Sequence, residues 1–228
     1  MCSDTSCVAL RLEGPLQSWG TASQYNRRMT DILPSRSAVM GMLCAALGLS
    51  RGSGEEKTFL HEMASVRMLA VAVPRVLDDR RLQVRRMEDY HTVQATLKAS
   101  GTFKDCHITR RQFLLDASFR VFLSGGRPLM EKVGAALQDP VWGLWLGRKA
   151  CIPSAPVFAG LFADERQAIA ACIPGGLREC ISSRDATSFA EGTDSVADMP
   201  LSFDSSDRAF ALRRIGFAHG DDGEMHAS

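Results

Sequence analysis

Hydrophobic and polar positions follow regular patterns in six segments of the chain. Alternating or largely apolar runs predict four strands, at residues 7–12, 66–73, 119–123 and 157–162. Apolar residues spaced three and four positions apart predict two helices, one after Ser35 and one from Pro128 to about Gln138. Ser35 is a preferred N-cap residue, and Gly48 lies where such a helix commonly ends. The elements therefore follow the order strand, helix, strand, strand, helix, strand.

This order predicts an α+β protein with a ferredoxin-like (RRM-like) β-α-β-β-α-β domain over residues 1–162. The two central strands are separated by an insertion at about residues 75–112, and connections of that length usually have a function. An antiparallel sheet with both helices on one face leaves its other face open, as in RNA-recognition modules. Residues 163–228 predict a small β-rich C-terminal region with an acidic, partly disordered tail.

Three shorter segments are less regular. Residues 51–57 predict a turn, and residues 58–63 predict a short helix. Within the insertion, Asp78-Asp79 predicts a hairpin turn, whereas residues 94–107 show no period, predict no element and are expected to include a mobile loop.

The composition is that of a folded protein, with 45% hydrophobic and 23% charged residues. The first residues show no signal-peptide pattern, and the longest apolar run, residues 38–49, is shorter than the ~20 residues of a membrane-spanning helix. We therefore expect a cytoplasmic protein with no membrane partner. The seven cysteines include no C-x-x-C pair, so we expect reduced thiols and neither a metal site nor another cofactor.

The net charge of +1 is unevenly distributed. Residues 75–111 contain nine Lys or Arg and five Asp or Glu, whereas residues 185–228 contain three Arg and nine Asp or Glu. A basic middle and an acidic end indicate two surfaces with different partners, one of them a polyanion. The alternative is a solvated charged face with no partner.

Five collinear blocks resemble one known family. They are LRLEGPLQSWGT (10–21), PSRSAVMGMLCAALGLSR (34–51), DYHTV (89–93), DASFRVFL (116–123) and LGRKACIPSAP (146–156). In this order they resemble the CasD family, the guide-handle subunit of the type I-E CRISPR Cascade complex, within the repeat-associated RNA-binding superfamily. The resemblance spans residues 8 to about 162.

The resemblance implies a ferredoxin-like domain whose insertion forms a thumb. It further implies a non-catalytic subunit of an antiviral ribonucleoprotein that binds the 5′ handle of the guide RNA (the crRNA). Its implied partners are the backbone subunit, whose filament it caps, and the large subunit, with target DNA bound only through the complex.

The start of the first helix is the first candidate RNA site. Exposed backbone amides at a helix N-terminus, the hydroxyls of Ser35 and Ser37 and the guanidinium of Arg36 together predict a phosphate site. The alternative is simple capping by Ser35 with Arg36 in solvent.

Two loops and the insertion supply the other candidates. In the loop after the first strand, Trp19 is a candidate for base stacking or, equally, for the core. Arginine pairs with phosphate and stacks on bases, which suits irregular single-stranded RNA. The full set of further RNA-binding candidates is Gln17, Ser18, Trp19, Arg27, Arg28, Tyr90, His91, Arg111, Arg148 and Lys149.

Two rival functions stay open. His91 as a base and Lys149 as a positive group would suit a metal-independent endoribonuclease that processes precursor crRNA. A protein–protein adaptor would instead use the charged insertion to bind an acidic partner. Trp142 and Trp145 are expected to serve packing or a subunit contact.

Overall fold

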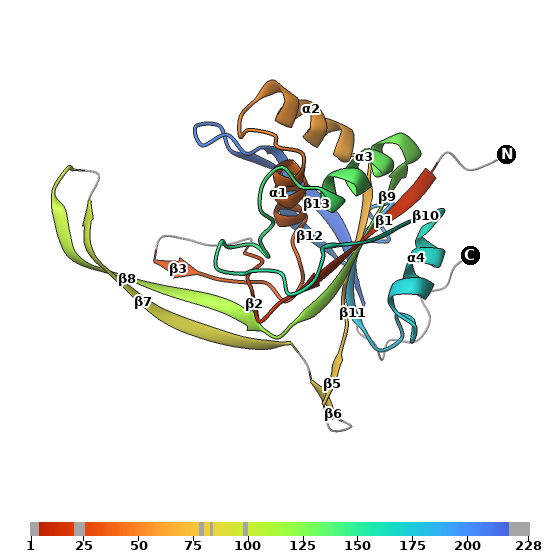
Figure 1. Cartoon of the computed structure of the whole chain (residues 1–228), viewed down its shortest axis with the longest axis horizontal. Helices are drawn as coiled ribbons and strands as arrows, with labels where there is room; N and C mark the ends of the chain where they lie inside the picture. Colours follow the sequence, from red (N-terminus) through yellow and green to blue (C-terminus); the bar gives the residue numbers. More distant parts are fainter. Residues whose placement is uncertain (1–4, 21–25, 78–79, 83, 98–99, 219–228) are drawn as a thin grey trace.

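A seven-stranded sheet forms the centre of the molecule (Figure 1). The computed structural model describes residues 5–20, 26–77, 80–82, 84–97 and 100–218. All neighbouring strands of this sheet are antiparallel. In spatial order they are β10 (Phe158–Phe162), β1 (Thr5–Glu13), β9 (Ser118–Gly126), β4 (Arg67–Ala72), β11 (Ile181–Asp185), β13 (Ala209–Ala218) and β12 (Asp194–Ser202).

Three helices pack on one face of the sheet, namely α1 (Arg36–Ala46), α2 (Gly54–Met63) and α3 (Arg127–Gln138). The alternation of β1 explains the arrangement, because Val8, Leu10 and Leu12 face these helices while Cys7 and Ala9 face the other way. The main core is therefore built between this sheet face and the apolar sides of the helices.

The opposite face is also covered over β10, β1, β9 and β4, so the predicted open face is wrong for these four strands. Helix α4 (Glu165–Cys172) packs against β1, β9 and β10. Its Ala168 joins a second buried cluster with Cys7, Ala9 and Phe122. These strands therefore offer no free surface for RNA on that face.

The four strands and two helices expected from the sequence are confirmed within a few residues. Helix α2 begins earlier than expected, at Gly54, because the Ser53 hydroxyl accepts a hydrogen bond from the Glu56 amide (3.1 Å) and caps it. Beyond residue 162, β11 pairs with β4, so the C-terminal strands continue the central sheet and are not a separate small region. The predicted disordered tail, residues 219–228, lies outside the described residues.

The insertion forms two hairpins. The long one, which we call the thumb, consists of β7 (Arg85–Leu97) and β8 (Phe103–Leu115) and extends away from the body (Figure 1). Residues 94–107 therefore belong mostly to paired strands, and the predicted loop is limited to the connection between Leu97 and Phe103. Both faces of the thumb are largely exposed, so its strands show no apolar alternation.

The short hairpin pairs β5 (Arg75–Leu77) with β6 (Arg80–Leu82), which confirms the expected hairpin, although Asp78-Asp79 lies outside the described residues. At the base of the thumb, two short strands pair with β8. These are β2 (Leu16–Gln17), which is antiparallel to it, and β3 (Arg27–Arg28), which is parallel.

Candidate nucleic-acid interface

An open pocket of about 730 Å³ lies beside α1. Its walls come from α1 and the turn after it, the segment 142–149, β3 and the loop between β12 and β13. Among the described residues, five cationic side chains line it: Arg28, Arg51, Arg148, Lys149 and Arg208. Glu56 is the carboxylate within this described lining; it is fully buried and already accepts two backbone amide hydrogen bonds. The pocket is therefore strongly positive.

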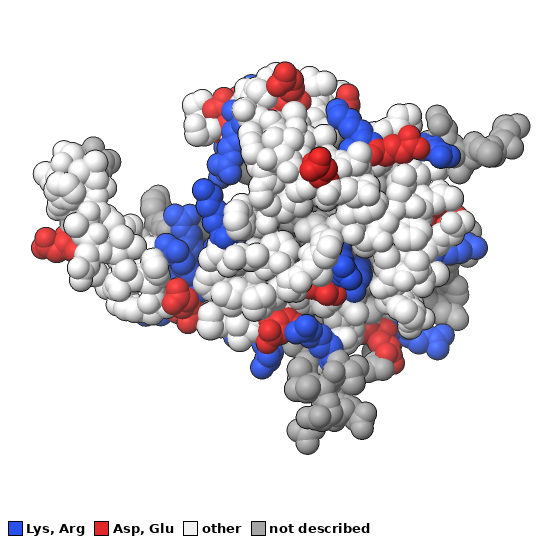
Figure 2. Space-filling view, in the orientation of Figure 1, with Lys and Arg blue, Asp and Glu red and all other residues white. Residues whose placement is uncertain are grey.

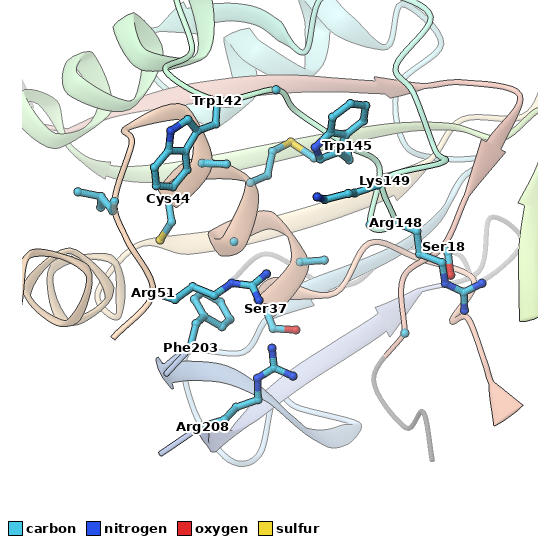
Figure 3. A pocket seen from close by; sticks show the side chains of 18 of the residues that line it. Ser18, Ser37, Cys44, Arg51, Trp142, Trp145, Arg148, Lys149, Phe203 and Arg208 are labelled. Atoms are coloured by element: carbon cyan, nitrogen blue, oxygen red, sulfur yellow. The ribbon is translucent and has the colours of Figure 1, made fainter. Parts of the chain in front are cut away.

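The cations enter the pocket from opposite sides (Figure 3). Arg51 and Arg208 point toward one another beside Ser37, and Lys149 points in from the opposite wall. Trp142 and Trp145 lie above them and are 46% and 39% exposed. Cations beside exposed aromatic rings are typical of single-stranded nucleic-acid sites, where the backbone meets the charges and bases stack on the rings.

A tight turn presents Arg148 and Lys149 to the pocket. The Cys151 amide donates to the Arg148 carbonyl (2.8 Å), and the Leu146 amide donates to the Cys151 carbonyl (2.8 Å). Gly147 has φ +94°, and a Cβ there would lie 1.8 Å from the Ser18 carbonyl oxygen. The turn therefore needs glycine at this position.

A cluster of guanidinium groups lies where the thumb meets the body. The parallel pairing of β3 with β8 places Arg28 beside Arg111 on one face, whereas Arg27 and Arg110 lie beside each other on the other face. Arg148 joins Arg28 and Arg111 in the cluster, because its Nη2 donates to the Arg28 carbonyl (2.8 Å) and the charges of Arg28 and Arg111 act on it. In Figure 2, Lys and Arg side chains gather along the edge of the body that faces the thumb.

Arg148 is short of hydrogen-bond acceptors. Its guanidinium lies 4.8 Å from the centre of the Phe113 ring, and its buried Nη1 has no partner among the described residues. Burial lowers the pKa of Arg148, and the positive charges of Arg111 and Arg28 lower it too. An oxyanion bound here would supply the missing acceptor and relieve the repulsion.

The thumb separates two candidates that are adjacent in sequence. Tyr90 is 59% exposed and pairs with Arg110, whereas His91 pairs with Thr109. Neighbouring residues of a strand point to opposite faces, so Tyr90 and His91 present their rings on different sides of the thumb. By the same register, His91 shares its face with Arg111.

Two candidates in the loop after β1 prove to be core residues. Gln17 is fully buried and donates its amide hydrogens to the carbonyls of Leu12 (3.1 Å) and Ala117 (2.7 Å). Trp19 is fully buried and packs edge-on against Phe119, with 6.4 Å between the centres of the two rings. Their predicted RNA contacts are therefore wrong, since neither side chain reaches the surface.

Ser18 is a partial exception in this loop. It is also buried, and its hydroxyl donates to the Gln112 carbonyl (3.3 Å), but it belongs to the pocket lining.

The predicted phosphate site at the start of α1 is also wrong. Arg36 is fully buried; its Nη1 meets Asp185 at 2.7 Å, and its Nη2 donates to the carbonyls of Met63 (2.6 Å) and Val66 (2.7 Å). The Arg36 backbone amide donates to the Asp198 carboxylate (2.7 Å). A protein carboxylate thus occupies the place expected for a phosphate.

The two serines of this motif have different roles. Ser35 is buried and caps the helix by accepting from the Ala38 amide (3.4 Å), as in the alternative of simple capping. Ser37 lines the pocket near Arg51 and Arg208, so it stays a candidate for RNA contact.

A buried ionic network explains why Arg36 is buried and why a carboxylate lies at the start of α1. Arg213 on β13 forms two hydrogen bonds to Asp198 on β12 (2.9 and 2.8 Å) and a third to Asp185 on β11. Burial alone would lower the pKa of Arg213, but the hydrogen bonds and charge of Asp198 raise it. Two acids of the acidic C-terminal segment therefore hold the C-terminal strands to the start of α1.

Sequence reasoning missed Arg51 and Arg208 and expected only packing or subunit contacts from Trp142 and Trp145. Arg51 is the last residue of the resembling block of the first helix, which was a signal for it. Arg208 lies in a segment rich in Asp, and its position in the pocket depends entirely on the pairing of β12 with β13.

Two further findings concern metal ligands and membrane-spanning helices. Among the described residues, no group of three or more His, Cys, Asp or Glu side chains is arranged to hold a metal ion. Within the same residues, every helix is too short or too polar to cross a bilayer.

Comparisons with known proteins point to one family. A family model described as CRISPR-associated protein (Cas_Cas5) matches residues 7–216. The chain is 34% identical over 164 residues to the CRISPR system Cascade subunit CasD of Escherichia coli (strain K12), which covers 68% of this chain and 70% of that protein.

Solved structures agree with the sequence comparison. One chain, described as part of a CRISPR RNA-guided surveillance complex, superposes with a TM-score of 0.70 at 26% identity over 93% of this chain and 89% of its own length. A second, described as a Cas protein, reaches a TM-score of 0.59 at 27% identity and covers 93% of each chain. The protein belongs to the CRISPR-associated Cas_Cas5 family.

Proposed function

We propose that this protein is a non-catalytic subunit of a CRISPR Cascade complex and binds the 5′ handle of the guide RNA. The observation that carries the proposal is the pocket beside α1, where five cations and two exposed tryptophans meet the guanidinium cluster of the thumb base. The similarity to a Cascade subunit and to a chain of an RNA-guided complex supports it.

In the proposed mechanism the protein positions RNA and performs no chemistry on it. Phosphates bind Arg51, Arg208 and Lys149 in the pocket and the unsatisfied Nη1 of Arg148 at its edge. Bases turn away from the backbone and stack on Trp142 and Trp145. Phosphate contacts fix the register of the strand, and the shape of the pocket limits which bases fit.

We assign the scaffold to the ferredoxin-like class. Taken in chain order, β1, β4, β9 and β10 are the four strands of such a domain, and their spatial order β10-β1-β9-β4 places the first and third strands in the middle. The two helices between them, α1 and α3, share one face. The thumb is then an insertion between the second and third strands, as the sequence pattern predicts.

The thumb is the proposed contact to the backbone subunit, whose filament this chain would cap. Near its tip the paired residues Leu97 and Phe103 are 67% and 68% exposed, and a protein partner that buries this apolar pair would gain stability. A contact with the large subunit completes the proposed assembly, and target DNA is reached only through that assembly.

The direct test is co-purification. When a tagged form of this chain is expressed with the other genes of its operon and a CRISPR array, we expect it to recover several subunits and an RNA of uniform length. Sequencing that RNA should show a common 5′ end derived from the repeat. Recovery of the subunits without RNA would favour the adaptor function instead.

The endoribonuclease alternative has its own test. Lys149 lines the pocket, whereas His91 lies on the thumb and is not among the described residues that line it. We expect the purified chain to leave repeat RNA intact in the presence of EDTA, on a denaturing gel, with wild type and His91→Ala giving the same result. Cleavage by the wild type that His91→Ala abolishes would establish the nuclease.

A further inference from the structure

Glu56 is a buried carboxylate that the proposed RNA contacts do not use. Its side chain is fully buried at the wall of the pocket, among residues that include Arg51 and Arg208. A buried negative charge in a site for a polyanion weakens the binding of that polyanion. The hydrogen bonds of Glu56 indicate another role in the protein.

One oxygen of Glu56 joins two separate parts of the pocket wall. Oε2 accepts a hydrogen bond from the Gly52 amide (3.0 Å), in the turn that carries Arg51. The same atom accepts from the Phe203 amide (3.2 Å), at the start of the loop that carries Arg208. The two parts are about 150 residues apart in the chain, and this single atom bonds both of them.

Local structure holds Glu56 in place. It is the third residue of α2, and its own amide donates to the Ser53 hydroxyl (3.1 Å). The carboxylate folds back over the helix N-terminus and accepts from the Gly52 amide, one residue before the amide that a capping box uses. Partial positive charge at a helix N-terminus stabilises the carboxylate there. Gly52 has φ +77°, and Asp204 packs against the position of a Cβ at that residue, so the turn and the loop fit closely.

We infer that Glu56 is a positioning residue, which sets the separation of Arg51 and Arg208 and so the geometry in which both reach one RNA backbone. The inference depends on the proposed function and extends it to a residue that makes no RNA contact. Without the bonds through Oε2, the 51–52 turn and the 203–208 loop keep the packing of Asp204 against Gly52 but lose the hydrogen bonds that fix their separation. Each arginine must then be ordered when RNA binds, which weakens binding.

The effects of side-chain length and of charge at position 56 can be separated with two conservative variants. Glu56→Gln keeps the length and an oxygen acceptor but removes the charge. Glu56→Asp keeps the charge but is one methylene too short to bridge Gly52 and Phe203. If Glu56 acted only as a negative charge, Gln would strengthen RNA binding and Asp would leave it unchanged.

The measurement is the affinity of the full chain for a labelled single-stranded RNA with the CRISPR repeat sequence, by fluorescence anisotropy. We expect Glu56→Asp to bind about fivefold to tenfold more weakly and Glu56→Gln to stay within about twofold of wild type. Arg208→Ala should also cost less affinity in the Glu56→Asp background than in wild type, because the two residues act together. Wild-type affinity for Glu56→Asp, or an unchanged cost of Arg208→Ala, overturns the inference.

Two controls keep the result interpretable. Glu165→Asp makes the same change on α4, on the opposite face of the sheet, and should leave RNA affinity unchanged. Hydrogen exchange at the Gly52 and Phe203 amides should accelerate in Glu56→Asp and not in Glu56→Gln. If the wild type binds no RNA while exchange follows this pattern, the proposed function fails and the positioning role stands; if exchange does not respond, the positioning role fails.

Discussion

Replacing Asp198 with alanine is expected to lower the free energy of unfolding by about 3–5 kcal/mol. The carboxylate is buried and accepts two hydrogen bonds from Arg213 and one from the Arg36 backbone amide. Its removal leaves the buried Arg213 with only Asp185 and leaves the Arg36 amide without its acceptor. A buried charge that has lost its partner costs much more than a surface pair, which explains the size of the effect.

Urea denaturation followed by circular dichroism measures this change. Asp194→Ala is the matched control, because Asp194 lies exposed on the same strand, β12, and its loss should change the stability little. Equal midpoints for Asp198→Ala and Asp194→Ala would show that the ionic network does not hold the C-terminal strands to α1.

Removing three pocket cations together, in Arg51→Ala/Arg148→Ala/Arg208→Ala, is expected to weaken RNA binding by about 100-fold or more at low salt. The three side chains line one pocket but come from three distant parts of the chain. Each neutralised phosphate of a single strand contributes about 0.7 to the slope of log affinity against log salt, so the slope should fall by about 2.

A second triple variant tests whether position or net charge matters. Arg67, Arg166 and Arg178 are exposed and do not line the pocket, so their replacement by alanine removes the same charge elsewhere. That variant should keep nearly the wild-type slope. If both triple variants lose affinity and slope equally, RNA binds through general charge and the pocket is not the site. If the affinity of the wild type for RNA does not change with salt concentration, the result would favour the adaptor function with a protein partner.

The Cas_Cas5 scaffold places these two effects in different layers of one molecule. In the interior, the ionic network holds the C-terminal strands against α1. The pocket lies on the outer surface of the same region. Arg208 follows β12, which contributes Asp198 to the network, so the network also determines where Arg208 reaches the pocket. A destabilised network should therefore weaken RNA binding as well as the fold.

The sequence by itself determined the order of the four strands and two helices of the predicted domain, the cap at Ser35 and the basic character of residues 75–111. These are local properties, since periodicity and capping depend on residues a few positions apart. It also identified Arg28, Arg148 and Lys149, which line the pocket, and the family, through five blocks of residues.

Only the tertiary structure decided which arginines are free to bind. Arg36 and Arg51 flank the same helix, yet Arg36 is fully buried against Asp185 and Arg51 lines the pocket. The acids that neutralise Arg36 lie about 150 residues further along the chain, and no local pattern shows that they will meet it. Burial and ion pairing are set by such long-range contacts, which is why the sequence predicted a phosphate where the fold places Asp198.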